Sequence, residues 1–293
     1  MKNGKFVAAV LIPAFGFLAF FAFYPVVYGL GISFFDFNPA NSHNDFIGLE
    51  NYARLMHDPL FWKSVGNTLF FCLVAVSANI VITLTLAEII CHIPKKWMRT
   101  LFRTILFIPC VAPIVGTSII WKYGIIATDG GLINNILGML FGIPPTNWTL
   151  TEMPMMLIII LYTLWADIGY NVILFTAGLE SVPKELEEAA RVDGAGALRR
   201  FFSVRIPLIR RSFVFVAIMT MADYFQMFAQ FNVLVADGGR NYAAMVLTNL
   251  IYRTSFKSFD MGYAAAISMA LFVIVMTVAI IQDRVMKADW SYE

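Results

Sequence analysis

Residues 68–90 read TLFFCLVAVSANIVITLTLAEII, a run in which Glu88 is the single charged side chain. An α-helix rises about 1.5 Å per residue, so this run is long enough to cross the roughly 30 Å hydrocarbon core of a bilayer. The whole chain has the same character, because 59% of its 293 residues are hydrophobic, 14% are charged and the mean hydropathy is +0.74. Soluble domains carry roughly 25% charged residues, so the composition predicts an integral membrane protein and excludes the soluble and disordered classes.

Five further apolar stretches on either side of this run are long enough to span a bilayer: 7–34, 104–121, 155–179, 212–236 and 261–282. The predicted fold class is therefore all-α integral membrane, with six transmembrane helices and both termini on the same side. The first stretch exceeds the core of a signal peptide, which has about 7–15 residues, and no small-residue cleavage site follows it. We therefore expect it to be retained as a helix.

Basic residues predict the orientation. The segments that share a side with the termini hold 15 of the 21 Lys and Arg residues. Positively charged loops stay in the cytoplasm, so both termini are expected there. Among the outer segments, 46–58 and 130–142 place apolar residues at helical spacing and predict short interfacial helices.

Several kinds of chemistry are excluded by what the sequence lacks. The three histidines and three cysteines are scattered, so they indicate no metal site, haem site or disulfide framework. No phosphate-binding G-x-x-x-x-G-K-[ST] loop occurs. We expect no catalytic, metal or cofactor residues in this chain, which predicts that it is not an enzyme and that any ATP is bound by another protein.

The most polar stretch, about 180–211, lies between the fourth and fifth predicted spans. Ser181 and Pro183 predict the start of a helix, and Gly194 predicts its end. A second short helix is expected at about 197–204, before Pro207 interrupts the chain. The small-residue corner between these helices could insert into a groove on a cytoplasmic partner. The alternative is a solvated loop whose basic residues only fix the topology.

The order of residues in this stretch resembles the EAA loop of permease subunits of binding-protein-dependent ABC importers. The match comprises Glu188, Ala189, Ala190, Asp193, Gly194 and Ala195, followed by Phe202 and Ile206-Pro207-Leu208. Further agreement lies at Tyr24-Pro25, Gly48 to Tyr52, Ala177-Gly178-Leu179 and Gly238-Gly239. The chain is most similar to the sugar-permease branch, which includes the maltose, multiple-sugar and glycerol-phosphate types. Arg210-Arg211 departs from the pattern, because relatives often continue there with proline and apolar residues.

The resemblance implies a division of the chain into a first transmembrane helix with an external segment (1–66), a five-helix transport core containing the loop (67–285) and a cytoplasmic tail (286–293). It implies that the six matching loop residues form a coupling helix that sits in a cleft of a cytoplasmic ATPase. The implied partners are a second, related permease, two ATPase subunits that bind ATP and Mg, and an extracellular substrate-binding protein, with no nucleic acid. The implied location is the plasma membrane of a prokaryote, most simply a bacterium.

Polar groups inside a span are costly, so each is a candidate for the substrate pathway. The fourth predicted span holds Asp167, Tyr170 and Asn171, and the fifth holds Asp223, Tyr224, Gln226, Gln230 and Asn232. Carboxylates and amides pair with sugar hydroxyls, while aromatic rings pack against the apolar face of the sugar. The alternative is that these groups bond to neighbouring helices. Glu88 and Trp121 lie near predicted helix ends, where we expect snorkelling and interfacial anchoring.

Three functions are compatible with these features. The leading interpretation is a permease subunit of an ATP-driven importer for a sugar or oligosaccharide. The second keeps this architecture but carries a non-sugar solute. The third is a self-contained ion-coupled carrier that uses Asp167 and Asp223 as coupling groups. A carrier that acts alone needs no docking corner, so the loop discriminates between the importer and the carrier.

Overall fold

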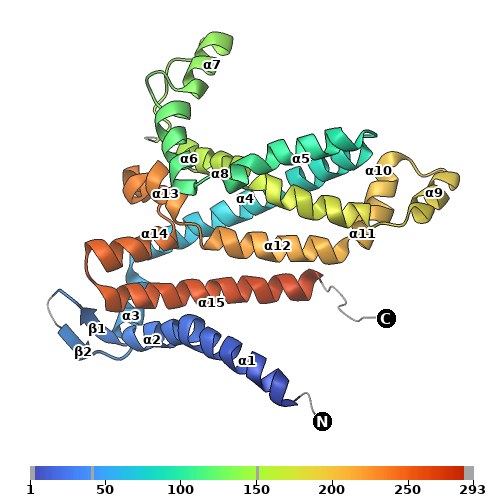
Figure 1. Cartoon of the computed structure of the whole chain (residues 1–293). Helices are drawn as coiled ribbons and strands as arrows, with labels where there is room; N and C mark the ends of the chain where they lie inside the picture. The colour runs from blue at the N-terminus through green and yellow to red at the C-terminus, as the bar shows by residue number, and fades with distance from the viewer. Residues whose placement is uncertain (1–3, 41–42, 150–151, 287–293) are drawn as a thin grey trace. The chain divides into compact units, whose positions relative to one another are not determined.

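The computed structural model describes residues 4–40, 43–149 and 152–286, and its regular structure is almost entirely helical (Figure 1). Four helical segments are long and apolar enough to cross a membrane: Leu11–Ile32, Pro59–His92, Pro154–Glu180 and Met261–Met286. The first runs through α1 (Gly4–Leu18), the short π-helix η1 (Ala19–Phe23) and α2 (Tyr24–Ile32). The other three belong to α4 (Pro59–His92), α8 (Glu152–Glu180) and α15 (Met261–Met286). The predicted membrane fold is confirmed as mostly helical, with one short β-hairpin in addition.

Two of the predicted spans are not continuous helices. The span predicted at 104–121 corresponds to two helices, α5 (Lys96–Val111) and α6 (Ile114–Ile120), the second of which is extended by η2 (Trp121–Ile125). The axes of the two helices are bent by 94° relative to each other. Pro113 explains the break, because it lacks an N–H and forces the preceding residue into an extended conformation. The span predicted at 212–236 is divided between α12 (Arg210–Phe225) and α13 (Ala229–Leu234). Helix α12 has only 16 residues, fewer than the roughly 20 that a span needs. The described residues therefore contain four spans, or five if the bent pair counts as one.

The chain divides into two compact units, of which the first comprises Met1–Ser64 and Leu247–Ile274. Besides α1 and α2, it contains the hairpin of β1 (Phe35–Asn38) and β2 (His43–Phe46), followed by α3 (Glu50–His57). It also holds α14 (Leu247–Tyr252), η6 (Arg253–Lys257) and the beginning of α15. The hairpin is antiparallel, with Phe35 opposite Phe46. Helix α3 confirms the short helix predicted within 46–58.

Close backbone contacts hold the first unit together. The Asn51 amide donates hydrogen bonds to the carbonyls of Ser33 at 2.9 Å and Phe35 at 3.0 Å, which fixes the hairpin to α3. Gly262 lets the start of α15 approach the hairpin, because a Cβ at this position would lie 2.1 Å from the Phe35 carbonyl oxygen. These contacts make the hairpin, α3 and the start of α15 one packed group.

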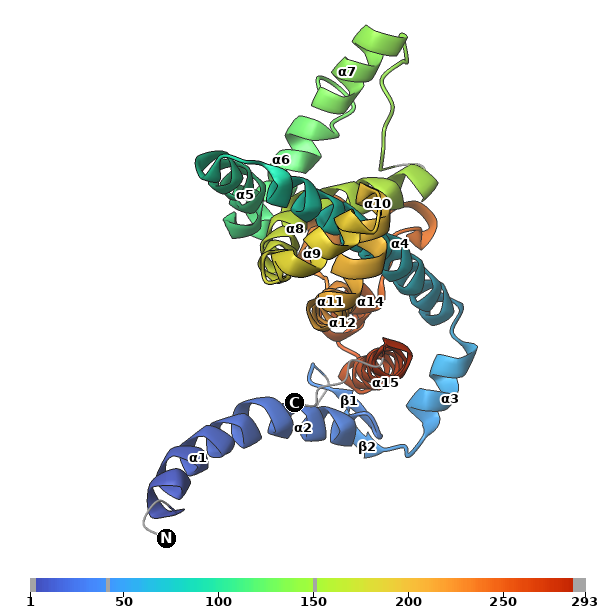
Figure 2. The same ribbon diagram turned by 90° about the vertical axis from the view of Figure 1, so that its right-hand side faces the viewer.

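The second unit comprises Val65–Val246 and Val275–Glu293. Most of α4 runs alongside α5, α8 and α12 in a bundle (Figures 1 and 2). At one end lie α9 (Lys184–Val192) and α10 (Ala197–Arg200), and at the other lie α6, α13 and α7 (Leu132–Phe141). Helix α7 confirms the short helix predicted within 130–142. The helical turns η4 (Ala236–Gly238) and η5 (Arg240–Tyr242) complete the unit after α13.

The bundle packs tightly near α9. A core cluster joins α4, α8 and α12 at this end and includes Val182 and Ile209, which flank the polar stretch, together with Leu84, Ala87, Phe175, Leu179 and Val216. Helices α5 and α8 touch at Gly169, where an added Cβ would lie 2.1 Å from the Leu106 carbonyl oxygen. The polar stretch therefore leaves and re-enters a close-packed core.

The domain division predicted from the resemblance stays a prediction. Its last segment, 286–293, lies outside the described residues apart from Met286.

Candidate coupling loop and buried polar cluster

Helix α9 begins later than predicted. It starts at Lys184, with Pro183 in the N-cap position. Glu185 and Glu187 lie in the first turn, where acidic side chains stabilise a helix because they face the positive end of its dipole. The Ser181 hydroxyl donates instead to the Gly178 carbonyl at 2.7 Å, so Ser181 belongs to the end of α8. The predicted serine cap is wrong because a bond within the preceding helix uses the hydroxyl.

The end of α9 is built on Gly194, as predicted. Gly194 has φ +79°, a left-handed conformation that residues with a Cβ rarely adopt. Its N–H donates to the Arg191 carbonyl at 3.0 Å, and the Ala195 N–H donates to the Ala190 carbonyl at 2.9 Å, the two bonds of a Schellman motif. The Arg200 guanidinium then donates to the Ala195 carbonyl at 2.7 Å. These bonds fix the shape of the corner without a partner.

The second helix of the loop differs in detail from the prediction. It consists of α10 followed by the π-helical turn η3 (Phe201–Arg205) and the short α11 (Ile206–Leu208). Pro207 lies in the first turn of α11, where its missing N–H costs nothing, so it does not interrupt the chain. The helical path is broken at Ile209, immediately before α12.

The corner exposes apolar side chains. Val192 and Leu198, on the two sides of Gly194, are 87% and 75% exposed. Of the six residues that match the EAA pattern, Ala190 and Ala195 are half-buried and the others are exposed. Large apolar side chains held outward on a fixed backbone, beside small residues, are typical of a docking surface.

Arg205 connects this loop to the bundle. Its side chain is buried, and its guanidinium lies 2.5 Å from a carboxylate oxygen of Glu88 on α4 and 2.8 Å from one of Glu187 on α9. Glu88 lies near the end of α4, as predicted, and an arginine distant in sequence pairs with its partly exposed carboxylate. Its snorkelling stays a prediction. Sequence reasoning missed Arg205, whose role depends on partners from two other helices.

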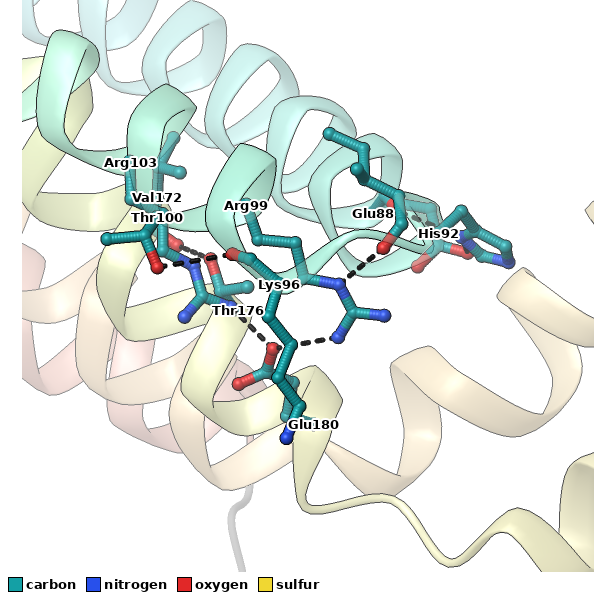
Figure 3. Close-up of polar contacts among 10 residues, drawn as sticks. Glu88, His92, Lys96, Arg99, Thr100, Arg103, Val172, Thr176 and Glu180 are labelled. Atoms are coloured by element: carbon teal, nitrogen blue, oxygen red, sulfur yellow. Dashed lines mark hydrogen bonds and ion pairs between the residues drawn. The ribbon is translucent and has the colours of Figure 1, made fainter.

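A second ion-pair group closes the same end of the bundle. Arg103 and Arg99 of α5 converge on Glu180 at the end of α8, at 2.5 Å and 3.6 Å (Figure 3). Arg99 also donates to the Ile93 carbonyl at 2.5 Å. Together, the two groups fasten the first residues of the loop to α4 and α5.

A buried polar cluster lies deeper in the bundle. The Asn171 amide of α8 donates to the Asn79 side-chain oxygen of α4 at 2.7 Å and to the Thr220 hydroxyl of α12 at 2.9 Å. The Asn79 amide donates to the Tyr224 hydroxyl at 2.8 Å, and that hydroxyl bonds to the carboxylate of Asp167. These side chains join three helices. Asn171 and Tyr224 therefore bond to neighbouring helices, which was the alternative to a role in the substrate pathway.

A small cavity adjoins the cluster where α5 breaks into α6. It measures about 120 Å³, and its lining includes Asp167, Gln230 and Thr163. The Thr163 hydroxyl is buried and has no hydrogen-bond partner among the described residues. Ligand pockets are typically about 300–1,000 Å³, so this cavity suits ordered water better than a sugar.

The eight candidate pathway residues fall into two groups. Asp167, Asn171, Tyr224 and Gln230 lie in or beside the buried cluster and its cavity. Tyr170, Asp223 and Gln226 are exposed and Asn232 is half-buried. The structure therefore brings together only half of the predicted set. The cluster also contains Asn79 and Thr220, which sequence reasoning missed because lone polar residues in apolar runs carry no motif.

The Trp121 side chain is buried inside the protein. It is 7% exposed, and its ring packs against those of Tyr162 and Trp165 at centroid distances of 5.4 Å and 5.6 Å. Its predicted role as an interfacial anchor is wrong, because the break between α5 and α6 turns this segment inward. Within 4–40, 43–149 and 152–286, no three His, Cys, Asp or Glu side chains gather in a way that could hold a metal ion.

A bundle of long apolar helices with a fixed, outward-facing loop at one end defines a class, the polytopic α-helical membrane proteins. A known family narrows this class. The profile described as "Binding-protein-dependent transport system inner membrane component" matches residues 79–288, and the chain belongs to this family. It is a transport permease subunit and not an enzyme.

Individual relatives agree with this assignment. The chain is 29% identical over 280 residues to the "Probable ABC transporter permease protein YurN" of Bacillus subtilis (strain 168), covering 94% of each chain. It is 30% identical to the "Arabinooligosaccharides transport system permease protein AraP" of Halalkalibacterium halodurans, over 96% of this chain and 88% of that one. Among solved structures, a chain of a bacterial ABC transporter for import of the acidic polysaccharide alginate superposes with a TM-score of 0.83 and 18% identity, covering 99% and 98%. That likeness establishes the fold.

Proposed function

We propose that this chain is the membrane-spanning permease subunit of an ATP-driven importer that translocates a sugar or oligosaccharide delivered by an external binding protein. Family membership supports the importer assignment. The cargo is inferred from the sugars in the names of its relatives and of the solved alginate transporter. A non-sugar solute is the alternative, and a panel of labelled solutes tested on the isolated binding protein separates the two. Binding of an amino acid or oxyanion and no sugar would contradict the sugar assignment.

The coupling loop docks into a cleft of a cytoplasmic ATPase. The observation that carries this proposal is the rigid Gly194 corner, which exposes Val192 and Leu198. Two ATPase subunits, which bind ATP and Mg, would close and move α9, and a second, related permease would complete the pore. Arg205 passes this movement to α4 because it holds both Glu187 and Glu88. The bundle then rocks between inward-open and outward-open states.

This function is compatible with six membrane crossings, two of which are made by interrupted helices. The bent α5–α6 pair is the third crossing, and α12 with α13 is the fifth. Thirteen of the described basic residues lie in segments assigned to the cytoplasm, in agreement with positively charged loops staying inside. Both termini are accordingly cytoplasmic, and the membrane is a bacterial plasma membrane.

The eight polar candidates take two roles in the pathway. Asp223 and Gln226 are exposed on this chain and would face the pathway shared with the second permease, together with Tyr170 and Asn232. Asp167, Asn171, Tyr224 and Gln230 set the positions of α8 and α12 and provide polar groups beside the helix break. No covalent chemistry is required of any of them.

Co-purification from the native host tests the docking role. Tagged wild type should bring down an ATPase and a second permease, whereas Gly194→Trp should retain the permease and lose the ATPase. Gly130→Trp is the matched control, since Gly130 also has a positive φ, +75°, and open space around it but lies just before α7 and outside the loop. It should retain both partners.

The outcomes separate the hypotheses. If both partners stay bound to Gly194→Trp, the corner is not the docking site. If the wild type is recovered alone under conditions that preserve other membrane complexes, the self-contained carrier becomes the better account. If both tryptophan variants lose the ATPase, backbone strain is the cause and docking at the corner is not supported.

A further inference from the structure

Helix α7 carries an apolar stripe that faces away from the protein. Its members follow the helical spacing i, i+4, i+7, i+8 and i+11: Leu132, Ile136, Met139, Leu140 and Ile143, the last just beyond the end of the helix. Their exposed fractions lie between 42% and 87%, with Met139 the highest. In a water-soluble protein such a stripe packs against the core.

The side of α7 away from the stripe carries one buried polar side chain, Asn134. Asn134 is 5% exposed, and its amide donates to the carbonyls of Ala127 and Thr146, each at 2.9 Å. Its side-chain oxygen accepts from the Thr146 N–H at 3.1 Å and the Trp148 indole N–H at 3.0 Å. These bonds fasten the helix to the chain before and after it. A buried amide therefore holds the helix in place while the apolar stripe stays exposed.

The position of α7 restricts what can cover this stripe. The helix starts at Leu132, seven residues after η2 ends the bent span at Ile125. Seven residues reach at most about 25 Å, so α7 lies close to a membrane boundary. Both ribbon views show it projecting sideways from the end of the bundle that is remote from α9 and α10 (Figures 1 and 2). That orientation is expected of a helix lying along a membrane surface.

The chemistry of the stripe favours lipid over a protein partner. Residues 130–149 contain no Lys, Arg, Asp or Glu. Asn135, the other amide on α7, donates to the Gly130 carbonyl at 3.1 Å. Protein interfaces carry roughly one hydrogen bond per 100–200 Å² and a polar rim, which this stripe does not offer. With ten residues, α7 is also too short to span the bilayer.

We infer that α7 is a membrane-surface helix whose stripe, centred on Met139 and Leu140, inserts among lipid acyl chains. Its assignment to the outer leaflet rests on the proposed orientation, but its contact with lipid does not. The helix thereby fixes the depth of the segment that follows the bent span.

Spin labelling in liposomes tests this inference. Single cysteines replace Ile136, Met139 or Leu140 in the assembled transporter, with Cys72, Cys91 and Cys110 changed to alanine and uptake used to verify folding. Attached nitroxides should relax strongly with oxygen, which concentrates in lipid, and weakly with a water-soluble nickel chelate. Gly138→Cys is the control, because Gly138 is exposed on the side of the same helix that faces away from the stripe, and it should show the reverse.

Each other outcome overturns the inference. Strong nickel relaxation at the stripe would place it in water, and protection from both reagents would place it against protein. Uptake recorded on the same samples keeps this test separate from the proposed function, because oxygen access at the stripe stands whether or not a sugar is transported. If the cysteine-free background fails to fold, quenching by brominated lipids of the fluorescence added by Met139→Trp, compared with that added by Gly138→Trp, gives the same answer.

Discussion

The coupling loop and the buried polar cluster lie in the same unit, but they obey opposite rules. The loop satisfies its backbone within itself and leaves its side chains exposed, so its shape depends on local sequence around Gly194. The cluster joins Asn79, Asn171 and Thr220 from three helices and leaves almost nothing exposed. Changes in the loop should therefore affect communication with a partner, whereas changes in the cluster or its packing should affect the folded protein itself.

The largest loss of stability is expected at Gly169, where α8 packs directly against the backbone of α5. Gly169→Ala would place a Cβ 2.1 Å from the Leu106 carbonyl oxygen and 2.7 Å from the Phe107 Cα. We expect a loss of about 3 kcal/mol in unfolding free energy, the upper part of the range for overpacking. The denaturation midpoint in detergent measures it. Gly116→Ala is the control, since its nearest neighbour is 4.0 Å away, and it should be neutral or stabilising by less than about 1 kcal/mol.

Arg205 joins the loop to α4, the helix that also carries Asn79 of the cluster, so its loss should destabilise the folded subunit. Arg205→Met leaves the carboxylates of Glu88 and Glu187 without their partner, and we expect a loss of about 2 kcal/mol, below the 3–5 typical of fully buried pairs because both glutamates are partly exposed. Thermal unfolding of the purified subunit measures it. Adding Glu88→Gln should recover part of the loss. Arg199→Met, at an exposed position on α10, should leave the midpoint unchanged.

The cluster itself should show a smaller effect. Asn171→Leu removes the bonds to Asn79 and Thr220, and at about 0.6 kcal/mol for each interhelical bond the expected loss is about 1 kcal/mol. The same unfolding measurement detects it. Tyr170→Phe, at an exposed neighbour on α8, should leave stability unchanged. Equal losses at both positions would mean that the cluster is not where α4, α8 and α12 are held together.

The smallest effect on global stability is expected at the loop corner. Gly194 has no atom near the position of a Cβ, so Gly194→Ala adds only the strain of a left-handed alanine, about 1 kcal/mol, confined to the end of α9. Amide exchange at Ala195 should accelerate about fivefold, with the unfolding midpoint unchanged. A shift of the midpoint as large as that of Gly169→Ala would abolish the distinction between the two regions.

The same distinction explains what could be predicted from the sequence. Four of the six predicted spans, α3, α7 and the Gly194 corner depend on local patterns, and the structure contains them. The pairing of Glu88 with Arg205 and the inward turn of Trp121 depend on residues far apart in the chain, so local reasoning placed both side chains at interfaces. The break in the third span was missed because apolar composition continues across Pro113 even though helical geometry does not.

In the proposed mechanism, the Gly194 corner transmits ATP-driven movement to the transport bundle. The most direct measurement is uptake per ATP hydrolysed, in liposomes that hold the complete transporter, for wild type, Gly194→Trp and Gly130→Trp. We expect Gly194→Trp to lose at least tenfold in this ratio while remaining inserted, and Gly130→Trp to match wild type. An unchanged ratio in Gly194→Trp would contradict the claim.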